Sequence, residues 1–148
     1  MTYNTGALFA FLLQFASAIV TLITWGSALI LVLAALIGAS LPPLTNVVAF
    51  ACMVTIVPVS ALQLYFGYGI YRCHSGAVNG SLVSNLAAAL LYVLIFLFGT
   101  EMVILLDQSE IFMAFVGINV VLVILLLMPP VRNELESPND QLNLDYVQ

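Results

Sequence analysis

The stretch ALFAFLLQFASAIVTLITWGSALILVLAALIGASL, residues 7–41, decides the fold of this chain. It contains no Asp, Glu, Lys, Arg or His, and the first proline follows at Pro42. A helix of about 20 residues crosses the roughly 30 Å hydrocarbon core of a bilayer. The stretch is therefore long enough to span a membrane, and a helix of this full length must tilt or project at one end.

Small and polar residues recur along this stretch at helical spacing. They are Ala10, Gln14, Ser17, Thr21, Thr24 and Ala28. Their steps alternate between three and four residues, which places them on one side of a helix. Membrane helices meet one another through such stripes. We therefore expect Gln14, Ser17, Thr21 and Thr24 to be helix-packing residues that face the third or fourth span.

The composition of the whole chain excludes an ordinary soluble domain. The chain has 148 residues, of which 64% are hydrophobic and 6% are charged. A soluble protein carries about 25% charged residues, so this one has too few to cover its surface in water. The sequence predicts an all-α polytopic membrane protein, a bundle of four transmembrane helices, whose first partner is the lipid bilayer.

Breaks in the apolar pattern divide the chain into a transmembrane domain, residues 1–131, and an acidic, flexible C-terminal tail, residues 132–148. The expected spans lie at about 7–39, 45–71, 82–106 and 111–128. Proline pairs at 42–43 and 129–130 end the first and last spans, because proline cannot continue a helix. Pro58 lies near the middle of the second span and predicts a kink there.

Two further helix-packing features lie in the third and fourth spans. Gly80, Ser84 and Ala88 form a small-xxx-small series that favours close helix contact. Asn119 lies near the centre of the fourth span, and an amide in hydrocarbon must find a partner, in a bond worth about 0.6–2 kcal/mol. We expect that partner on the first helix, at Gln14 or a neighbouring polar residue. A contact to a substrate or ion is the alternative.

The charges are few and predominantly acidic. Lysine is absent, Arg72 and Arg132 are the two cations, and seven acids give a net charge of −5. No nucleic acid is expected as a partner, because phosphate contacts need clustered Lys and Arg. A lysine-free, acidic composition is typical of archaeal and other high-salt organisms. With four spans both arginines fall on the side of the termini, so the positive-inside rule predicts cytoplasmic N- and C-termini.

The sequence predicts no catalytic, cofactor-binding or metal site. Cys73 and His74 are adjacent in a polar loop, but no second histidine or nearby cysteine completes a metal site. Glu101, Asp107 and Glu110 surround the exit of the third span without the spacing of a calcium loop. Ion pathways normally hold an ionisable group inside the membrane, and the predicted span cores hold none.

Two segments carry a resemblance to a known kind of protein. GYGIYRCHSGA, residues 67–77, closes one span and opens the next with a short basic hinge. INVVLVILLLMPPVRNEL, residues 118–135, ends the last span with proline and then a polar tail. Both resemble small four-helix integral membrane proteins of bacteria and archaea that have no assigned activity. Envelope proteins of archaeal viruses are similar in size, acidity and span count. The resemblance implies an architecture alone.

These observations predict a non-enzymatic structural or accessory integral membrane protein, for example a subunit of a larger membrane assembly. Its protein partners would be other membrane proteins or further copies of itself. One alternative is a small transporter or channel for a neutral solute. Another is a virion envelope protein, located in the virion or in the host membrane.

Overall fold

The fold comes from a computed structural model that describes residues 5–36, 44–72, 74, 76–98 and 109–136. Within these ranges the chain is helical and contains no strand, which confirms the all-α prediction for this part of the molecule. The helices are α1 (Thr5–Leu36), α2 (Leu44–Tyr71), α3 (Ala77–Phe98), α5 (Ser109–Leu127) and the short α6 (Pro129–Glu136).

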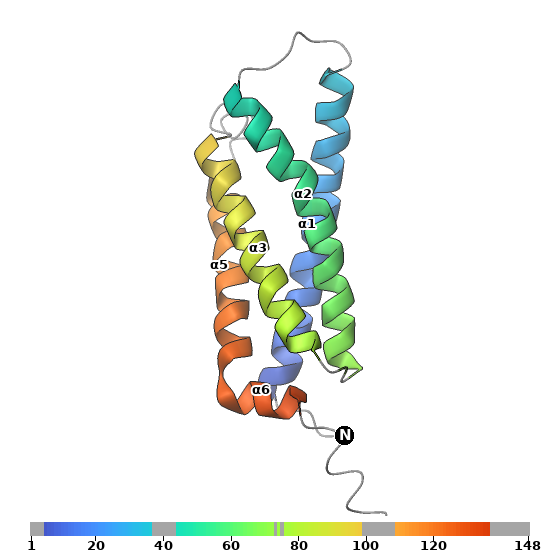
Figure 1. The fold of residues 1–148 in the computed structure, drawn as a ribbon, viewed down its shortest axis with the longest axis vertical. Helices are drawn as coiled ribbons and strands as arrows, with labels where there is room; N and C mark the ends of the chain where they lie inside the picture. The colour runs from blue at the N-terminus through green and yellow to red at the C-terminus, as the bar shows by residue number, and fades with distance from the viewer. Residues whose placement is uncertain (1–4, 37–43, 73, 75, 99–108, 137–148) are drawn as a thin grey trace, which may run out of the picture.

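The four long helices form an elongated bundle in which each packs against two neighbours (Figure 1). The packed pairs are α1 with α2, α2 with α3, α3 with α5, and α5 with α1. Consecutive helices run in opposite directions, and α6 lies across the end at which α1 begins (Figure 1). α1 and α3 therefore lie diagonally across the bundle, and they contact each other through side chains that cross its centre.

Three of the helices are long and apolar enough to cross a membrane. The apolar segments are Leu8–Ser27 in α1, Val47–Tyr71 in α2 and Ala77–Phe98 in α3. In α5 the apolar segment, Phe112–Leu127, is shorter. The expected extension of the third span to residue 106 lies outside the described residues.

Buried side chains recur at intervals of three and four residues along each long helix. In α5 the buried positions are Phe112, Phe115, Asn119, Leu122 and Leu126. An alternation of three and four keeps one seam of a helix directed at its partners, as in other antiparallel four-helix bundles. The bundle is thus held by narrow seams, and the remaining surface of each helix is exposed and largely apolar.

α3 begins at Ala77, earlier than the expected start of the third span at residue 82. Gly76 has a φ of +82°, a conformation that glycine adopts without steric cost and that reverses the chain between α2 and α3. The Gly80 amide then donates to the Gly76 carbonyl at 2.9 Å, which forms the first turn of the helix. Residues 79–81 belong to α3 because their backbone N–H and C=O groups continue this series of helical hydrogen bonds.

The chain remains helical after the proline pair, where a flexible tail was expected to follow. α6 starts at Pro129, and proline is tolerated in a first helical turn because its missing N–H has no acceptor there. The Arg132 amide donates to the Met128 carbonyl at 2.9 Å. Val131 is buried in a cluster with Ala10 and Val78, so α6 packs onto the bundle. Residues 137–148 of the expected tail lie outside the described residues.

Pro58 lies inside α2 without ending it. Its nitrogen carries no hydrogen, so the Val54 carbonyl lacks its usual donor four residues later. The nearby Thr55 hydroxyl donates to the Ala51 carbonyl at 2.7 Å. In Figure 1 the part of α2 before its midpoint runs obliquely and the part after it runs closer to the long axis of the bundle.

Candidate functional site

The most distinctive feature of the interior is a set of side-chain amides, one from each long helix. Gln14 of α1, Gln63 of α2, Asn85 of α3 and Asn119 of α5 are each at most 1% exposed. Together with Ser81 of α3 we call them the carboxamide layer. Burying an amide without a hydrogen-bond partner costs several kcal/mol in an apolar medium. The layer therefore stabilises the fold only if its polar atoms are hydrogen-bonded.

Gln63 occupies the centre of the carboxamide layer. Its Nε2 donates to Asn85 Oδ1 and to Asn119 Oδ1, both at 2.8 Å. One amide therefore joins α2 to α3 and to α5 through its two hydrogens. The Asn119 amide nitrogen donates in turn to the Phe115 carbonyl of its own helix at 2.8 Å.

Gln14 connects α1 to the other side of the layer. Its Nε2 donates to the backbone carbonyl of Gln63 at 2.9 Å. Its Oε1 accepts from the Ser81 hydroxyl and from Asn85 Nδ2, the latter at 3.3 Å. Asn85 Nδ2 also donates to the Ser81 carbonyl at 2.8 Å. The Gln14 side chain passes over Gly67 of α2, where its Nε2 would lie 3.5 Å from an added Cβ.

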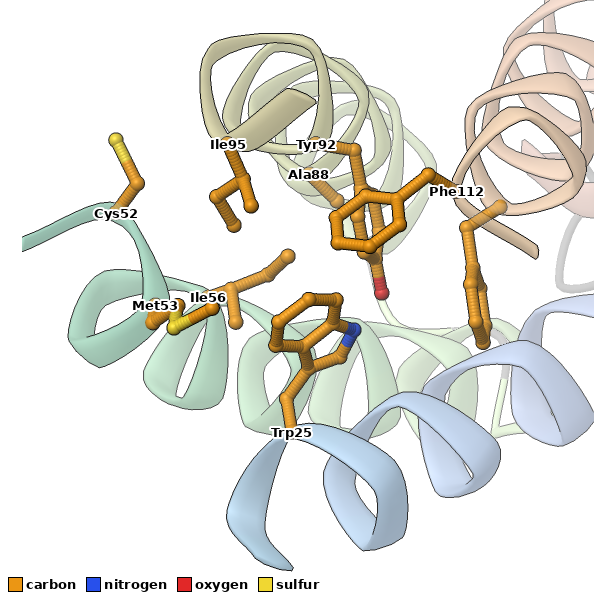
Figure 2. Close-up of a cluster of buried hydrophobic side chains, with 9 residues drawn as sticks. Trp25, Cys52, Met53, Ile56, Ala88, Tyr92, Ile95 and Phe112 are labelled. Atoms are coloured by element: carbon orange, nitrogen blue, oxygen red, sulfur yellow. The ribbon is translucent and has the colours of Figure 1, made fainter. Parts of the chain in front are cut away.

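Apolar clusters close the layer on both sides along the bundle axis. The first cluster contains Trp25, Cys52, Met53, Ile56, Ala88, Tyr92, Ile95, Phe112 and Phe115 (Figure 2). The second contains Ala10, Ile70, Ala77, Val78, Leu126 and Val131. Along each long helix the buried residues therefore change from apolar to polar and back to apolar. The layer is a polar cross-section inside an otherwise apolar interior.

Aromatic rings fill the first cluster. Tyr92 stacks on Phe115 with ring centroids 5.1 Å apart, and Trp25 meets Phe112 edge to face at 5.1 Å. The Tyr92 hydroxyl donates to Thr21 Oγ1 at 2.9 Å, which links α3 to α1 a second time. Ring pairs of this kind add about 0.5–1.5 kcal/mol each beyond area burial.

Two buried polar atoms have no hydrogen-bond partner among the described residues, Ser17 Oγ and Trp25 Nε1. In Figure 2 the nitrogen of the Trp25 indole is turned toward the Tyr92 hydroxyl, without reaching hydrogen-bond geometry. Both atoms belong to α1, one on each side of Thr21 along the helix.

The structure brings together most of the polar stripe expected on the first helix. Gln14, Ser17 and Thr21 are buried. Thr24 differs, because it is exposed and Trp25 occupies the buried position at this level. A turn of 3.6 residues directs Trp25 inward, four residues after Thr21. Ala28 lies outside the residues whose side chains are described.

The other expected packing residues lie in the seam between α3 and its neighbours. Ser84 is buried, and its hydroxyl donates to the Ser81 carbonyl at 3.0 Å. Ala88 is completely buried in the aromatic cluster. Gly80 lies beneath the Phe66 ring of α2, whose nearest atom would be 2.3 Å from an added Cβ.

The partner of Asn119 differs from the expected one. We expected a residue of the first helix, whereas Asn119 bonds to Gln63 of α2. Gln63, Asn85, Ser81 and Tyr92 were not singled out from the sequence at all. A signal for two of them existed, because Gln63 and Asn85 are amides inside apolar stretches, as Gln14 is in the first one. Which amides bond to one another depends on relative helix depth, which the pattern does not contain.

Among the described residues, the polar side chains expected as candidates outside the bundle interior form no comparable buried cluster. The expected pair Cys73 and His74 is described only at His74, which is exposed. Of the three acids after the third span, Glu110 is exposed and Glu101 and Asp107 lie outside the described residues. Among the residues that are described, no three His, Cys, Asp or Glu side chains come together as metal ligands.

Comparison with protein-family models, with curated proteins and with solved structures gave no match to this chain.

Proposed function

We propose that this chain is a non-enzymatic integral membrane protein of structural or accessory kind. In this proposal the bundle crosses the bilayer four times and serves as a subunit of a larger membrane assembly. Large apolar side chains exposed on every long helix support the membrane location, since a soluble monomer rarely exposes extended apolar patches. Examples are Ile23 of α1, Leu62 of α2, Val83 of α3 and Met113 of α5.

The observation that carries the accessory role is the internal pairing of the carboxamide layer. Its amide nitrogens donate to one another's oxygens and to backbone carbonyls, between two apolar clusters. Among the described residues the buried polar side chains are all uncharged. Ionisable groups inside membranes mark ion and proton pathways, whereas uncharged amides hold helices together. This arrangement favours a protein whose interior serves its own assembly.

The same proposal places the N- and C-termini in the cytoplasm. Arg72 directly follows α2, and Arg132 lies in α6, which covers the end where α1 begins (Figure 1). Both cations of the chain therefore lie at one end of the bundle. By the positive-inside rule this end faces the cytoplasm.

A specific observation favours one alternative, the transport of a neutral solute. Ser17 Oγ and Trp25 Nε1 are buried and lack hydrogen-bond partners among the described residues. Unpaired polar atoms beside an uncharged polar layer are the groups that a neutral, hydrogen-bonding solute would need. The aromatic cluster would have to open for such a path to exist, which is why we place this function second.

Mild solubilisation of the native membrane, followed by mass measurement and identification of co-purifying chains, tests the proposal. We expect a defined complex that contains this 15.9 kDa chain together with other membrane proteins. The identity of those chains would also test the virion-envelope alternative. A monomer or homo-oligomer without other chains would contradict the accessory role.

If the protein purifies without other chains, a measurement of solute flux into proteoliposomes tests the transport alternative. Flux that disappears in Ser17→Ala while helical content is retained would establish it. The matched control is Ser27→Ala, because Ser27 lies on the same helix but is exposed and donates to the Ile23 carbonyl of its own helix at 2.7 Å.

A further inference from the structure

Three exposed tyrosines lie along the last turns of α2, and the cation Arg72 follows the helix directly. Tyr65, Tyr68 and Tyr71 are 69%, 50% and 52% exposed, and their spacing of three places them on one side of the helix. Arg72 follows directly and is also exposed. On α1, Phe11 stacks on Tyr71 with ring centroids 5.5 Å apart.

Tyr68 holds the Arg72 side chain in one position. Arg72 Nε donates to the Tyr68 hydroxyl at 2.8 Å, and the guanidinium carbon lies 5.4 Å from the centre of the same ring. The hydrogen bond that Arg72 donates to the Tyr68 hydroxyl raises the pKa of Arg72 above its ordinary value, so the side chain stays charged. Tyr68 takes the Nε hydrogen, and no described residue is seen to accept a hydrogen bond from the two terminal nitrogens.

No carboxylate of the described residues neutralises Arg72. Its electrostatic partners are Tyr68 and Tyr71, and no described acid forms an ion pair with it. Of the seven acids of the chain, Glu110 is the one whose side chain is described, and it lies in the first turn of α5, at the opposite end of the bundle (Figure 1). The second cation lies at the same end of the bundle as Arg72, where Arg132 donates to Asn79 of α3 at 3.4 Å. Among the described side chains, both arginines therefore lie at one end of the bundle and the single acid lies at the other.

We propose that Arg72, held on Tyr68, binds the phosphate of an anionic phospholipid headgroup. This inference rests on the proposed membrane location. Arg72 directly follows the apolar segment Val47–Tyr71, and tyrosine rings gather at the level of lipid headgroups. A guanidinium matches phosphate geometry through two parallel N–H donors. The terminal nitrogens of Arg72, which have no hydrogen-bond partner among the described residues, supply these donors at the depth where phospholipids carry their phosphates.

The test uses delipidated full-length protein in a neutral detergent, titrated with phosphatidylglycerol or with phosphatidylcholine. Native mass spectrometry counts the lipids retained on the protein. We expect the wild type to retain phosphatidylglycerol in preference to phosphatidylcholine. Arg72→Gln should lower the affinity for phosphatidylglycerol about tenfold, since a charge-assisted bidentate contact is lost. Arg132→Gln, which removes the same charge at the same end, should change it much less.

Several results would overturn the proposal. Equal phosphatidylglycerol retention in Arg72→Gln and wild type would do so. An equal loss in both arginine variants would instead indicate a general charge effect. A third arm adds excess inorganic phosphate, and displacement of the lipid by it would indicate a site for free anions.

A second variant and an insertion control keep the result interpretable. Tyr68→Phe retains the ring but removes the acceptor of the Nε hydrogen, so we expect a weaker loss of about two- to threefold. Unchanged retention in this variant would contradict the positioning role of Tyr68. Incorporation into phosphatidylcholine nanodiscs tests the membrane location separately. Wild type that fails to incorporate contradicts the proposed function, whereas incorporation without lipid selectivity contradicts this inference alone.

Discussion

Gln63 forms hydrogen bonds to each of the other three long helices. Its side chain joins α2 to α3 and α5, and its carbonyl receives Gln14 of α1. Gln63→Met removes both side-chain donors at nearly constant volume and leaves two buried amide oxygens without them. We expect the free energy of unfolding to fall by about 1–3 kcal/mol, because a buried acceptor left unpaired retains its desolvation cost.

The measurement for Gln63→Met is reversible denaturation in mixed micelles with increasing SDS. The fluorescence of the single tryptophan, Trp25, follows the transition, since this ring packs on Tyr92 and Phe112. Leu62→Met is the matched control, because the neighbouring side chain is 48% exposed and receives the same substitute. Equal unfolding midpoints for the two variants would show that the layer adds no stability.

Ser17 and Thr21 carry hydroxyls on one face of α1. We expect their removal to change the free energy of unfolding by different amounts. Thr21→Val removes the acceptor of the Tyr92 hydroxyl, and we expect a loss of about 0.5–1.5 kcal/mol. Ser17→Ala removes a buried hydroxyl that has no described partner, so the free energy of unfolding should change by less than about 0.5 kcal/mol. The same denaturation measurement compares them. A larger loss in Ser17→Ala would mean that Ser17 has a partner such as a buried water.

At the scale of elements, the contact between α2 and α3 depends on Gly80. A Cβ added there would lie 2.3 Å from the Phe66 ring, so the ring or the helix must move. We expect Gly80→Ala to destabilise the bundle by about 1–3 kcal/mol, the usual cost of overpacking. Gly117→Ala is the control, because a Cβ on that exposed helical residue meets nothing within 4 Å. It should be neutral or stabilising by up to about 1 kcal/mol.

SDS titration of both glycine variants tests this contact. If Gly80→Ala were as stable as Gly117→Ala, the Phe66 ring would be free to rotate away, and α2 and α3 would not require a glycine between them.

The docking of α6 depends on Val131, which is 5% exposed and packs against the end of the bundle. Val131→Asp places a carboxylate in this apolar cluster, so we expect α6 to detach while the four long helices stay packed. Hydrogen exchange with mass spectrometry should show lost amide protection in residues 129–136 and unchanged protection in α3. Asn133→Asp adds the same charge at an exposed position of α6 and should leave protection intact. Retained protection in Val131→Asp would show that α6 does not need this contact.

At the scale of the whole molecule, the proposed topology predicts which end of the bundle faces the cytoplasm. In a Cys52→Ala chain the native Cys73 is the sole thiol, and it falls between α2 and α3 in the sequence. A membrane-impermeant maleimide should label it from the cytoplasmic side only. The control, Ser40→Cys in a chain lacking both native cysteines, should be labelled only from the opposite side. Labelling of both positions from one side would contradict four spans.

Much of this architecture follows from the sequence alone. The long apolar stretches determined the helices, three of which are long and apolar enough to cross a membrane. The three- and four-residue spacing determined that Gln14, Ser17 and Thr21 share a face. The same reasoning erred at Thr24, since a small polar residue and Trp25 compete for one inward position and the larger apolar ring occupies it.

The tertiary structure alone decided how the helices are matched in depth. Each apolar stretch of the sequence contains at least one amide, but the sequence does not show that Gln14, Gln63, Asn85 and Asn119 meet at one level. Hydrogen bonds act over about 3 Å, whereas a shift of one helical turn moves a side chain by about 5.4 Å. The pairing of Gln63 with Asn119 and the packing of α6 therefore depend on the assembled bundle, in which buried amides must find partners and apolar surfaces must find cover.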